Sequence, residues 1–302
     1  MNRPRLLWLP LAALVLVGCP GSSNMADDSP VDTTVTGITN SVDAAGRRAG
    51  LLSAFFGLDD ALPQMADRAV CDGAGGKDGM PVIFSQEVDV STLQAGDLKV
   101  VTESGAVGEI TCVTLAPADD PGEARTALLV GAYGSAEDQP VSVEVIGNVL
   151  SKDGQLNFRG AVVDVIELEA GPTLVLAEDV PEQEWALGKR ATRAPLGGGS
   201  GCPKGTAQVI RAVWAGGITK PGNDEVDDNE RLRYRVTLRD VNGDIRSVVP
   251  FALGDLGDGD NNHELCLDVR GAPLEVVFED GYVTDPRDDL NPLTRVSVSA
   301  GN

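Results

Sequence analysis

Short apolar or alternating segments, separated by turn residues, follow one another from Met80 to about residue 168. Their sequences are MPVIFSQEV, DLKVVTES, GEITCVTLAP, ARTALLVGAY, PVSVEVIGNVL and LNFRGAVVDVIEL. The intervening stretches, such as Asp119-Asp120-Pro121-Gly122 and Lys152-Asp153-Gly154, are rich in residues that favour tight turns. Many short strands at this spacing predict a β-sandwich.

The clearest alternation lies in residues 230–240, where Leu232, Tyr234, Val236 and Leu238 alternate with arginine and threonine. This pattern predicts a strand with one apolar face and one cationic face. The Asn-Gly pair within Asp240–Asp244 predicts a hairpin turn, because such turns need positive φ. Further strands are expected at 206–215, 245–253, 263–269, 274–278 and 294–300, which is enough for a second small sandwich.

Two other segments are harder to place from their pattern. Between residues 41 and 70, Leu51, Leu52, Phe55 and Phe56 fit helical spacing, so a short helical lead-in interrupted at Pro63 is expected. Residues 171–186 predict one more strand of the N-terminal domain.

The first nineteen residues have the pattern of an export signal. Arg3 and Arg5 precede an uncharged run over residues 6–17, which is shorter than the roughly 20 apolar residues that span a bilayer. This predicts a signal peptide over residues 1–18. The following stretch, rich in Ser, Asp, Thr and Pro, predicts a flexible tether over residues 19–45.

Leu16-Val17-Gly18-Cys19 resembles the bacterial lipobox. The resemblance implies that Cys19 is lipidated, with fatty-acyl chains such as palmitate, and becomes the new N-terminus. Pro20 stands where the enterobacterial inner-membrane retention pattern has Asp, so the expected location is the outer membrane or the cell surface. An ordinary signal peptide with a chance cysteine is the alternative.

Residues 81–93, PVIFSQEVDVSTL, resemble the opening of bacterial Ig-like domains found in S-layer and surface proteins. The resemblance implies a spacer or adhesive module, and these families bring no catalytic residues. The expected fold is therefore all-β, with two β-sandwich (Ig-like) domains after the signal peptide, tether and short helix. Glycines 197–199 and 201 mark a linker at 193–204, which divides the domains into 46–192 and 205–302.

Composition limits the partners. The formal net charge of −22 makes nucleic acid and anionic lipid headgroups poor binding surfaces and favours the capture of cations. Besides Cys19, the chain has Cys71, Cys112, Cys202 and Cys266, an even number that indicates two disulfides in an exported protein. Three pairings are possible, and proximity favours Cys71–Cys112 with Cys202–Cys266. A zinc site is disfavoured, because no CxxC spacing occurs and His263 is the single histidine.

Alternating strand directions would bring three acidic loops, 222–229, 254–262 and 279–291, to one end of the C-terminal domain. Crowded carboxylates repel one another, and calcium relieves this by accepting six to eight oxygen ligands. The segment 258–262 matches the opening of a calcium loop, but His263 and Val269 depart from the EF-hand pattern. The candidate metal ligands are Asp255, Asp258, Asp260, Asn262, Asp224, Asp227 and Asp228. Simple solvated turns are the competing interpretation.

These features favour a membrane-anchored binding, adhesion or envelope-structural module, stabilised by calcium and without catalytic residues. The expected partners are the membrane, through the lipid, and a protein or polysaccharide of the cell envelope. The alternative is an exported polysaccharide hydrolase that uses acidic loop residues of the C-terminal domain. His263, the residue that a Ser-His-Asp triad would need, is expected at a loop or strand edge, and no G-x-S-x-G motif is present.

Overall fold

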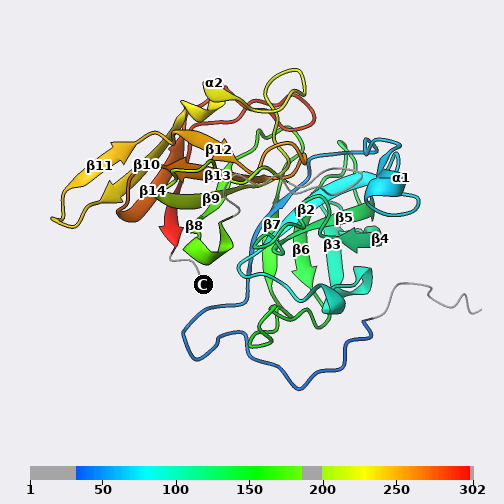
Figure 1. Cartoon of the computed structure of the whole chain (residues 1–302). Helices are drawn as coiled ribbons and strands as arrows, with labels where there is room; N and C mark the ends of the chain where they lie inside the picture. The colour runs from blue at the N-terminus through cyan, green and yellow to red at the C-terminus, as the bar shows by residue number, and fades with distance from the viewer. Residues whose placement is uncertain (1–31, 186–198, 300–302) are drawn as a thin grey trace, which may run out of the picture.

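The computed structural model describes residues 32–185 and 199–299 and contains two β-sheets that lie side by side, each with its own core (Figure 1). The predicted signal peptide and Cys19 lie outside the described residues. The predicted all-β fold is confirmed, since helices within the described ranges are single turns.

The N-terminal domain is a seven-stranded sheet with the order β3-β6-β7-β1-β2-β5-β4. Its elements are β1 Leu51–Phe55, α1 Ala66–Ala69, β2 Asp78–Phe84, η1 Val90–Thr92, η2 Ala95–Asp97, β3 Leu98–Thr102, β4 Glu109–Thr114, β5 Thr126–Ala132, β6 Pro140–Val145 and β7 Val162–Ile166.

The C-terminal domain is an eight-stranded sheet with the order β11-β10-β14-β15-β8-β9-β13-β12. Its elements are β8 Leu174–Asp179, η3 Glu182–Glu184, β9 Gln208–Trp214, α2 Asp228–Arg231, β10 Tyr234–Arg239, β11 Ile245–Val248, β12 Ala252–Gly254, β13 Asn262–Leu267, β14 Ala272–Phe278 and β15 Thr294–Ser299.

Both sheets have the strand order of an immunoglobulin-type sandwich. With β1 to β7 taken as strands A to G, one layer is A-B-E-D and the other is C-F-G. The C-terminal domain repeats this order from β8 to β15, with β11 as an added strand beside β10. In each domain the first and last strands pair in parallel, β1 with β7 and β8 with β15, which joins the two layers into one curled sheet.

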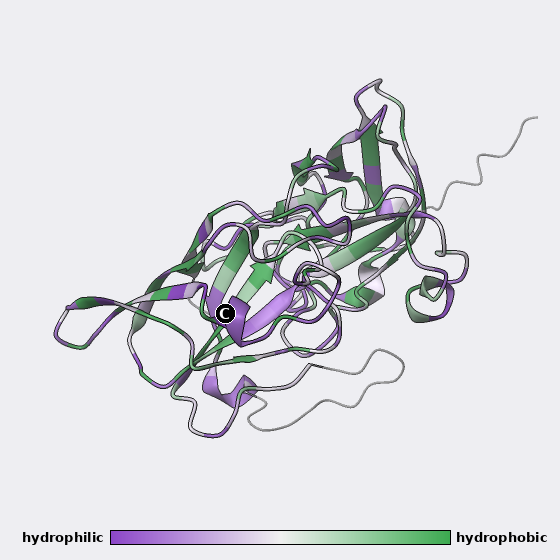
Figure 2. Ribbon diagram, turned by 90° about the horizontal axis from the view of Figure 1, so that it is seen from above, coloured by the Kyte–Doolittle hydropathy of each residue, from purple (hydrophilic) through white to green (hydrophobic). Residues whose placement is uncertain are grey.

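Side-chain alternation explains these strands. On β10, Tyr234, Val236 and Leu238 are fully buried while Arg235 and Thr237 are half-buried, as the period of two predicts. The hairpin at Asp240–Asp244 is present, and Gly243 supplies the positive φ of 91°. Figure 2 shows the hydrophobic residues concentrated along the strands and the hydrophilic residues along the connections.

The strand predicted within residues 171–186 belongs to the other domain. It is β8, which pairs with β9 and β15 of the C-terminal sheet. The sheets therefore separate between Ile166 and Leu174, and the predicted boundary at 193–204 is wrong. Residues 193–198 lie outside the described residues, while Ser200 bonds to Asp255 within the C-terminal domain. The glycine-rich stretch is thus part of the long connection between β8 and β9.

Two further expectations at the N-terminus are corrected. Leu51–Phe55 form a central strand rather than a helix. β1 pairs with β2 and β7, and four of its five residues are buried, so its apolar residues lack a period of two. Residues 32–45, expected in the flexible tether, run along the N-terminal domain instead. The side chain of Asn148 donates to Asp32, and that of Asn157 donates to the carbonyl of Ile38.

The predicted strand 245–253 is two strands, β11 and β12, at opposite edges of the C-terminal sheet, since the chain changes layers at Pro250. The position expected for His263 is also wrong. It lies buried on β13, where Nδ1 contacts the Tyr234 hydroxyl at 2.8 Å, and that hydroxyl accepts a hydrogen bond from Trp214 Nε1 at 2.9 Å. Burial lowers the pKa of His263 to about 4.

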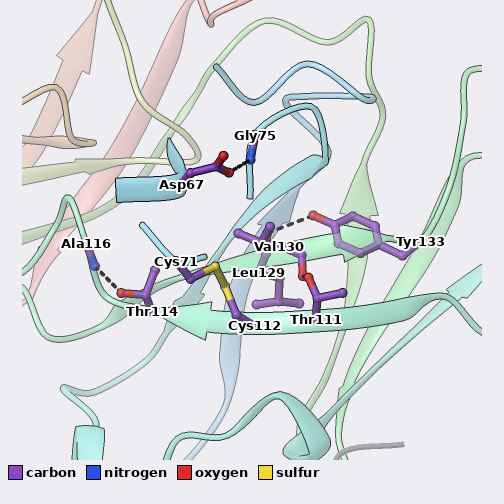
Figure 3. The surroundings of a disulfide bond; sticks show 10 residues. All are labelled: Asp67, Cys71, Gly75, Thr111, Cys112, Thr114, Ala116, Leu129, Val130 and Tyr133. Carbon is purple, nitrogen blue, oxygen red and sulfur yellow. Dashed lines mark hydrogen bonds between the residues drawn. A yellow bond between two sulfur atoms is a disulfide. The ribbon is translucent and has the colours of Figure 1, made fainter. Parts of the chain in front are cut away.

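The structure joins Cys71 to Cys112 and Cys202 to Cys266. Each bond attaches the long connection between the first two strands of a domain to its A-B-E-D layer. Figure 3 shows Cys71, which follows α1, bonded to Cys112 on β4, near Val130 on β5 and Tyr133 just after that strand. Both disulfides therefore stabilise connections that have little regular structure of their own.

Candidate functional site

The two domains meet at a buried polar junction. Arg125, at the start of β5 in the N-terminal domain, donates from Nη2 to Oε2 of Glu178 on β8 at 2.8 Å. Arg211 on β9 donates to the other Glu178 oxygen at 3.2 Å and to the carbonyls of Pro121 and Gly122 in the β4–β5 loop. All three charged side chains are less than a tenth exposed. One carboxylate thus joins a cation from each domain.

The local sequence explains why charges occupy this position. All seven residues of β9 are buried, because Ile210, Ala212 and Trp214 face the C-terminal core while Arg211 faces the N-terminal domain. On the neighbouring strand β13, Leu265 and Leu267 face the core and Glu264 lies on the opposite side, 4.0 Å from Arg211. The outer face of this layer is therefore an interface rather than a solvated surface.

Five carboxylates gather beside this ion-pair network, from one loop of each domain. The β12–β13 loop contributes Asp255, Asp258 and Asp260, and the β4–β5 loop contributes Asp120 and Glu123. They form two overlapping groups, in each of which one oxygen per residue lies within 4.8 Å of the others. The groups are Asp120, Asp255 and Asp258, and Glu123, Asp255 and Asp260. Asp255 belongs to both groups.

Hydrogen bonds satisfy only part of this cluster. Asp260 accepts from the backbone and side-chain amides of Asn262 at 2.8 and 2.7 Å, and Asp120 accepts from the amide of Gly199 at 3.0 Å. Asp255 Oδ2, Asn262 Oδ1 and Glu264 Oε2 are buried without a hydrogen-bond partner. A Cβ at position 199 would lie 2.0 Å from Asp255 Oδ1, so only glycine allows this close approach.

Burial and mutual repulsion raise the pKa values of the cluster. Burial is the largest cause in each case. The pKa of Asp255 rises to about 7 and that of Asp258 to about 6, while those of Glu123 and Asp260 rise well above their ordinary values. Repulsion from nearby carboxylates adds to the shift. A hydrogen bond between Glu123 and Asp255 raises the pKa of Glu123 and lowers that of Asp255, and the charge of Arg211 lowers the pKa of both. Ionised carboxylates are thus costly here unless a cation joins them.

The structure divides the predicted metal ligands into two sets. Asp255, Asp258, Asp260 and Asn262 come together at the junction, whereas Asp224, Asp227 and Asp228 are exposed. Asp227 caps α2 and binds Lys220 at 2.8 Å, and Asp228 binds Arg231 at 2.7 Å. The other two loops do reach this end of the domain. Glu225 accepts a hydrogen bond from the amide of Gly257, and Thr284 of the 279–291 loop pairs with Thr219. The loops converge, but Asp227 and Asp228 of the 222–229 loop bind local partners, whereas Glu225 reaches the neighbouring 254–262 loop.

The prediction missed Asp120 and Glu123, because they come from the other domain and look like ordinary turn residues. It also missed Arg211 and Glu264. The sequence does give a signal for these two, since each is a charged residue flanked by apolar residues of a strand, in VIRAVW and ELCL. A charge at such a position indicates a buried partner.

Comparisons with known proteins add little to this description. No protein-family model and no curated protein matches the chain. Two solved structures with similarity are the N-terminal part of the bacterial S-layer protein SbsC, with 9% identity and a TM-score of 0.28, and domains 1–6 of SbsC, with 12% identity and a TM-score of 0.20. They cover 83% and 85% of this chain, and the chain spans 44% and 42% of theirs. TM-scores this low do not establish a shared fold, so the fold assignment rests on strand order.

Between residues 32 and 185 and between 199 and 299, no helix has the length and hydrophobicity needed to cross a membrane.

Proposed function

We propose that this chain is an exported bacterial lipoprotein, anchored by lipid at Cys19, which serves as a rigid structural or adhesive module of the cell envelope. Its two Ig-type domains act as one body that presents a surface on the cell envelope. The partner is a protein or polysaccharide of the envelope.

The observation that carries this proposal is the Arg125–Glu178–Arg211 network across the domain junction. Flexibly linked domains meet through small solvated surfaces, whereas this interface buries two guanidinium groups and a carboxylate. Only residues 167–173 connect β7 to β8, and so short a connection also restricts rotation between the domains. A module held in one orientation suits a role in support or display.

The anchoring is tested by expressing the full chain in a Gram-negative host fed with an alkyne analogue of palmitate. The wild-type chain should incorporate the label and partition into the detergent phase of Triton X-114. A variant with Cys19→Ser should be exported without label. An unlabelled wild-type chain, or a Cys19→Ser variant that keeps the label, would contradict the proposed anchor.

A further inference from the structure

We infer that the carboxylate cluster between the β12–β13 and β4–β5 loops is a calcium site, with Asp255 as the shared ligand, that joins the two domains. This site goes beyond the structural role proposed above and does not depend on lipid anchoring. Its ligands come from both domains, so the bound cation would stabilise their relative orientation.

The distances fit a calcium ion. Calcium binds carboxylate oxygens at 2.3–2.6 Å, so oxygens around one ion lie up to about 5 Å apart. The oxygens of Glu123, Asp255 and Asp260 meet this condition, as do those of Asp120, Asp255 and Asp258. Because Asp255 is common to both groups, the cluster accommodates one ion or two neighbouring ions that share this carboxylate.

The charges at the junction call for a cation. Seven carboxylates lie at the junction, and two guanidinium groups, Arg125 and Arg211, face them. If all were ionised, the excess would be five negative charges in a largely buried region. Those carboxylates are Asp120, Glu123, Glu178, Asp255, Asp258, Asp260 and Glu264. Arg211 carries one positive charge, which interacts with Glu178 and Glu264 as well as with Glu123 and Asp255 of the cluster. A single charge shared in this way cannot neutralise the cluster.

Unpartnered oxygens supply a second, independent observation. Asp255 Oδ2 has no hydrogen-bond partner although the residue is only 8% exposed, and Asp255 lies in both carboxylate groups. Asn262 Oδ1 is equally unpartnered at 1% exposure, and its amide nitrogen bonds to Asp260. Buried oxygens without partners are costly, and coordination of a cation removes that cost. All of these donors are oxygens, which favours calcium over zinc or copper.

The test uses the mature chain with both disulfides formed, treated with EDTA and dialysed, and calcium chloride as the probe. Isothermal titration should show one or two ions bound per chain. Saturating calcium should raise the melting temperature by about 5 °C or more. Magnesium at the same concentration should have a smaller effect, because it requires stricter octahedral geometry. No bound calcium and no melting shift at millimolar concentrations, or an equal effect of magnesium, would overturn the assignment.

Variants separate this site from general acidity. Asp255→Asn should weaken calcium binding at least tenfold, yet melt at or above the wild-type temperature in EDTA, because one buried charge is removed. Asp228→Asn, an exposed carboxylate in the same domain, is the matched control and should bind calcium like the wild type. Glu123→Gln serves as the second variant and tests the contribution of the N-terminal domain.

Wild-type affinity in both Asp255→Asn and Glu123→Gln, or an equal loss in Asp228→Asn, would exclude this site. The rigid arrangement of the domains is measured separately, by spin labels on each domain, so failure of the calcium site is distinguishable from failure of the proposed function.

Discussion

Arg125 of the N-terminal domain and Glu178 of the C-terminal domain form an ion pair of 2.8 Å in which both side chains are less than a tenth exposed. The pair lines a cleft of about 330 Å³ between the domains, together with Arg211. Such a pair is costly to desolvate but still more costly to break, since removal of one partner leaves a buried charge. It therefore favours a single orientation of the two domains.

Glu178→Gln should lower the free energy of unfolding by roughly 3–5 kcal/mol, because Arg125 loses its carboxylate partner and Arg211 loses one of the two carboxylates within 4.0 Å of it. Urea unfolding followed by circular dichroism measures the change. The control is Glu182→Gln, which breaks the exposed pair with Arg270 and should cost less than about 1 kcal/mol. Equal effects of the two substitutions would show that the buried pair at the junction stabilises the protein no more than an exposed pair does.

Replacement of Cys202 and Cys266 by alanine should destabilise the C-terminal domain. The bond closes a loop with a sequence separation of 64, for which chain entropy predicts a loss of about 4 kcal/mol. The urea midpoint measures the loss, and peptide mapping without reduction tests the pairing itself. A midpoint equal to that of the wild type, or a disulfide between the domains, would contradict the structure.

Asp97 should make the stability of the N-terminal domain depend on pH. It is fully buried, Oδ2 accepts from the amide of Gln94, and burial together with nearby Asp32 raises its pKa to about 6. Because the folded state holds this proton more tightly than the unfolded state, stability falls as the pH rises from about 4 to 6. The shift of about two pKa units corresponds to roughly 3 kcal/mol lost above pH 6.

Asp97→Asn keeps the acceptor for Gln94 and removes the charge, so it should stabilise the domain at pH 7 and reduce the pH dependence between 4 and 6. Melting temperatures measured across this range test the prediction. Asp164→Asn, an exposed carboxylate on β7, is the control and should leave the profile unchanged. A steeper fall with Asp97→Asn, or lower stability at pH 7, would show that the buried charge stabilises the fold.

Much of the fold follows from local patterns in the sequence. The strands at 234–239 and 208–214 and the hairpin at Gly243 are predictable, because alternation and turn residues act over a few positions. The assignment of β8 to a domain is different. It depends on pairing with β15, whose residues lie about 120 positions later, and no local pattern records that partner. The glycine-rich stretch, a typical linker by composition, therefore gave the wrong boundary.

The candidate site was predictable only in part for the same reason. Asp255, Asp258 and Asp260 lie in one loop, so the local density of carboxylates indicated them. Asp120 and Glu123 join them only because the β4–β5 loop packs against the outer face of β9 and β13. Conversely, the loop that contains Asp227 and Asp228 is as acidic as the site loop. These two carboxylates instead cap α2 or form ion pairs with neighbouring cations.

A distance measurement between spin labels on the two domains tests whether they form one rigid body. Val107 in the N-terminal domain is 62% exposed and Val241 in the C-terminal hairpin is fully exposed, so Val107→Cys and Val241→Cys accept labels without disturbing either core. Double electron–electron resonance on the mature chain in calcium, with the ion pair intact, should give a single narrow distance distribution. The distribution should broaden in the Glu178→Gln variant. A broad distribution in the wild-type chain would contradict a rigid arrangement of the two domains.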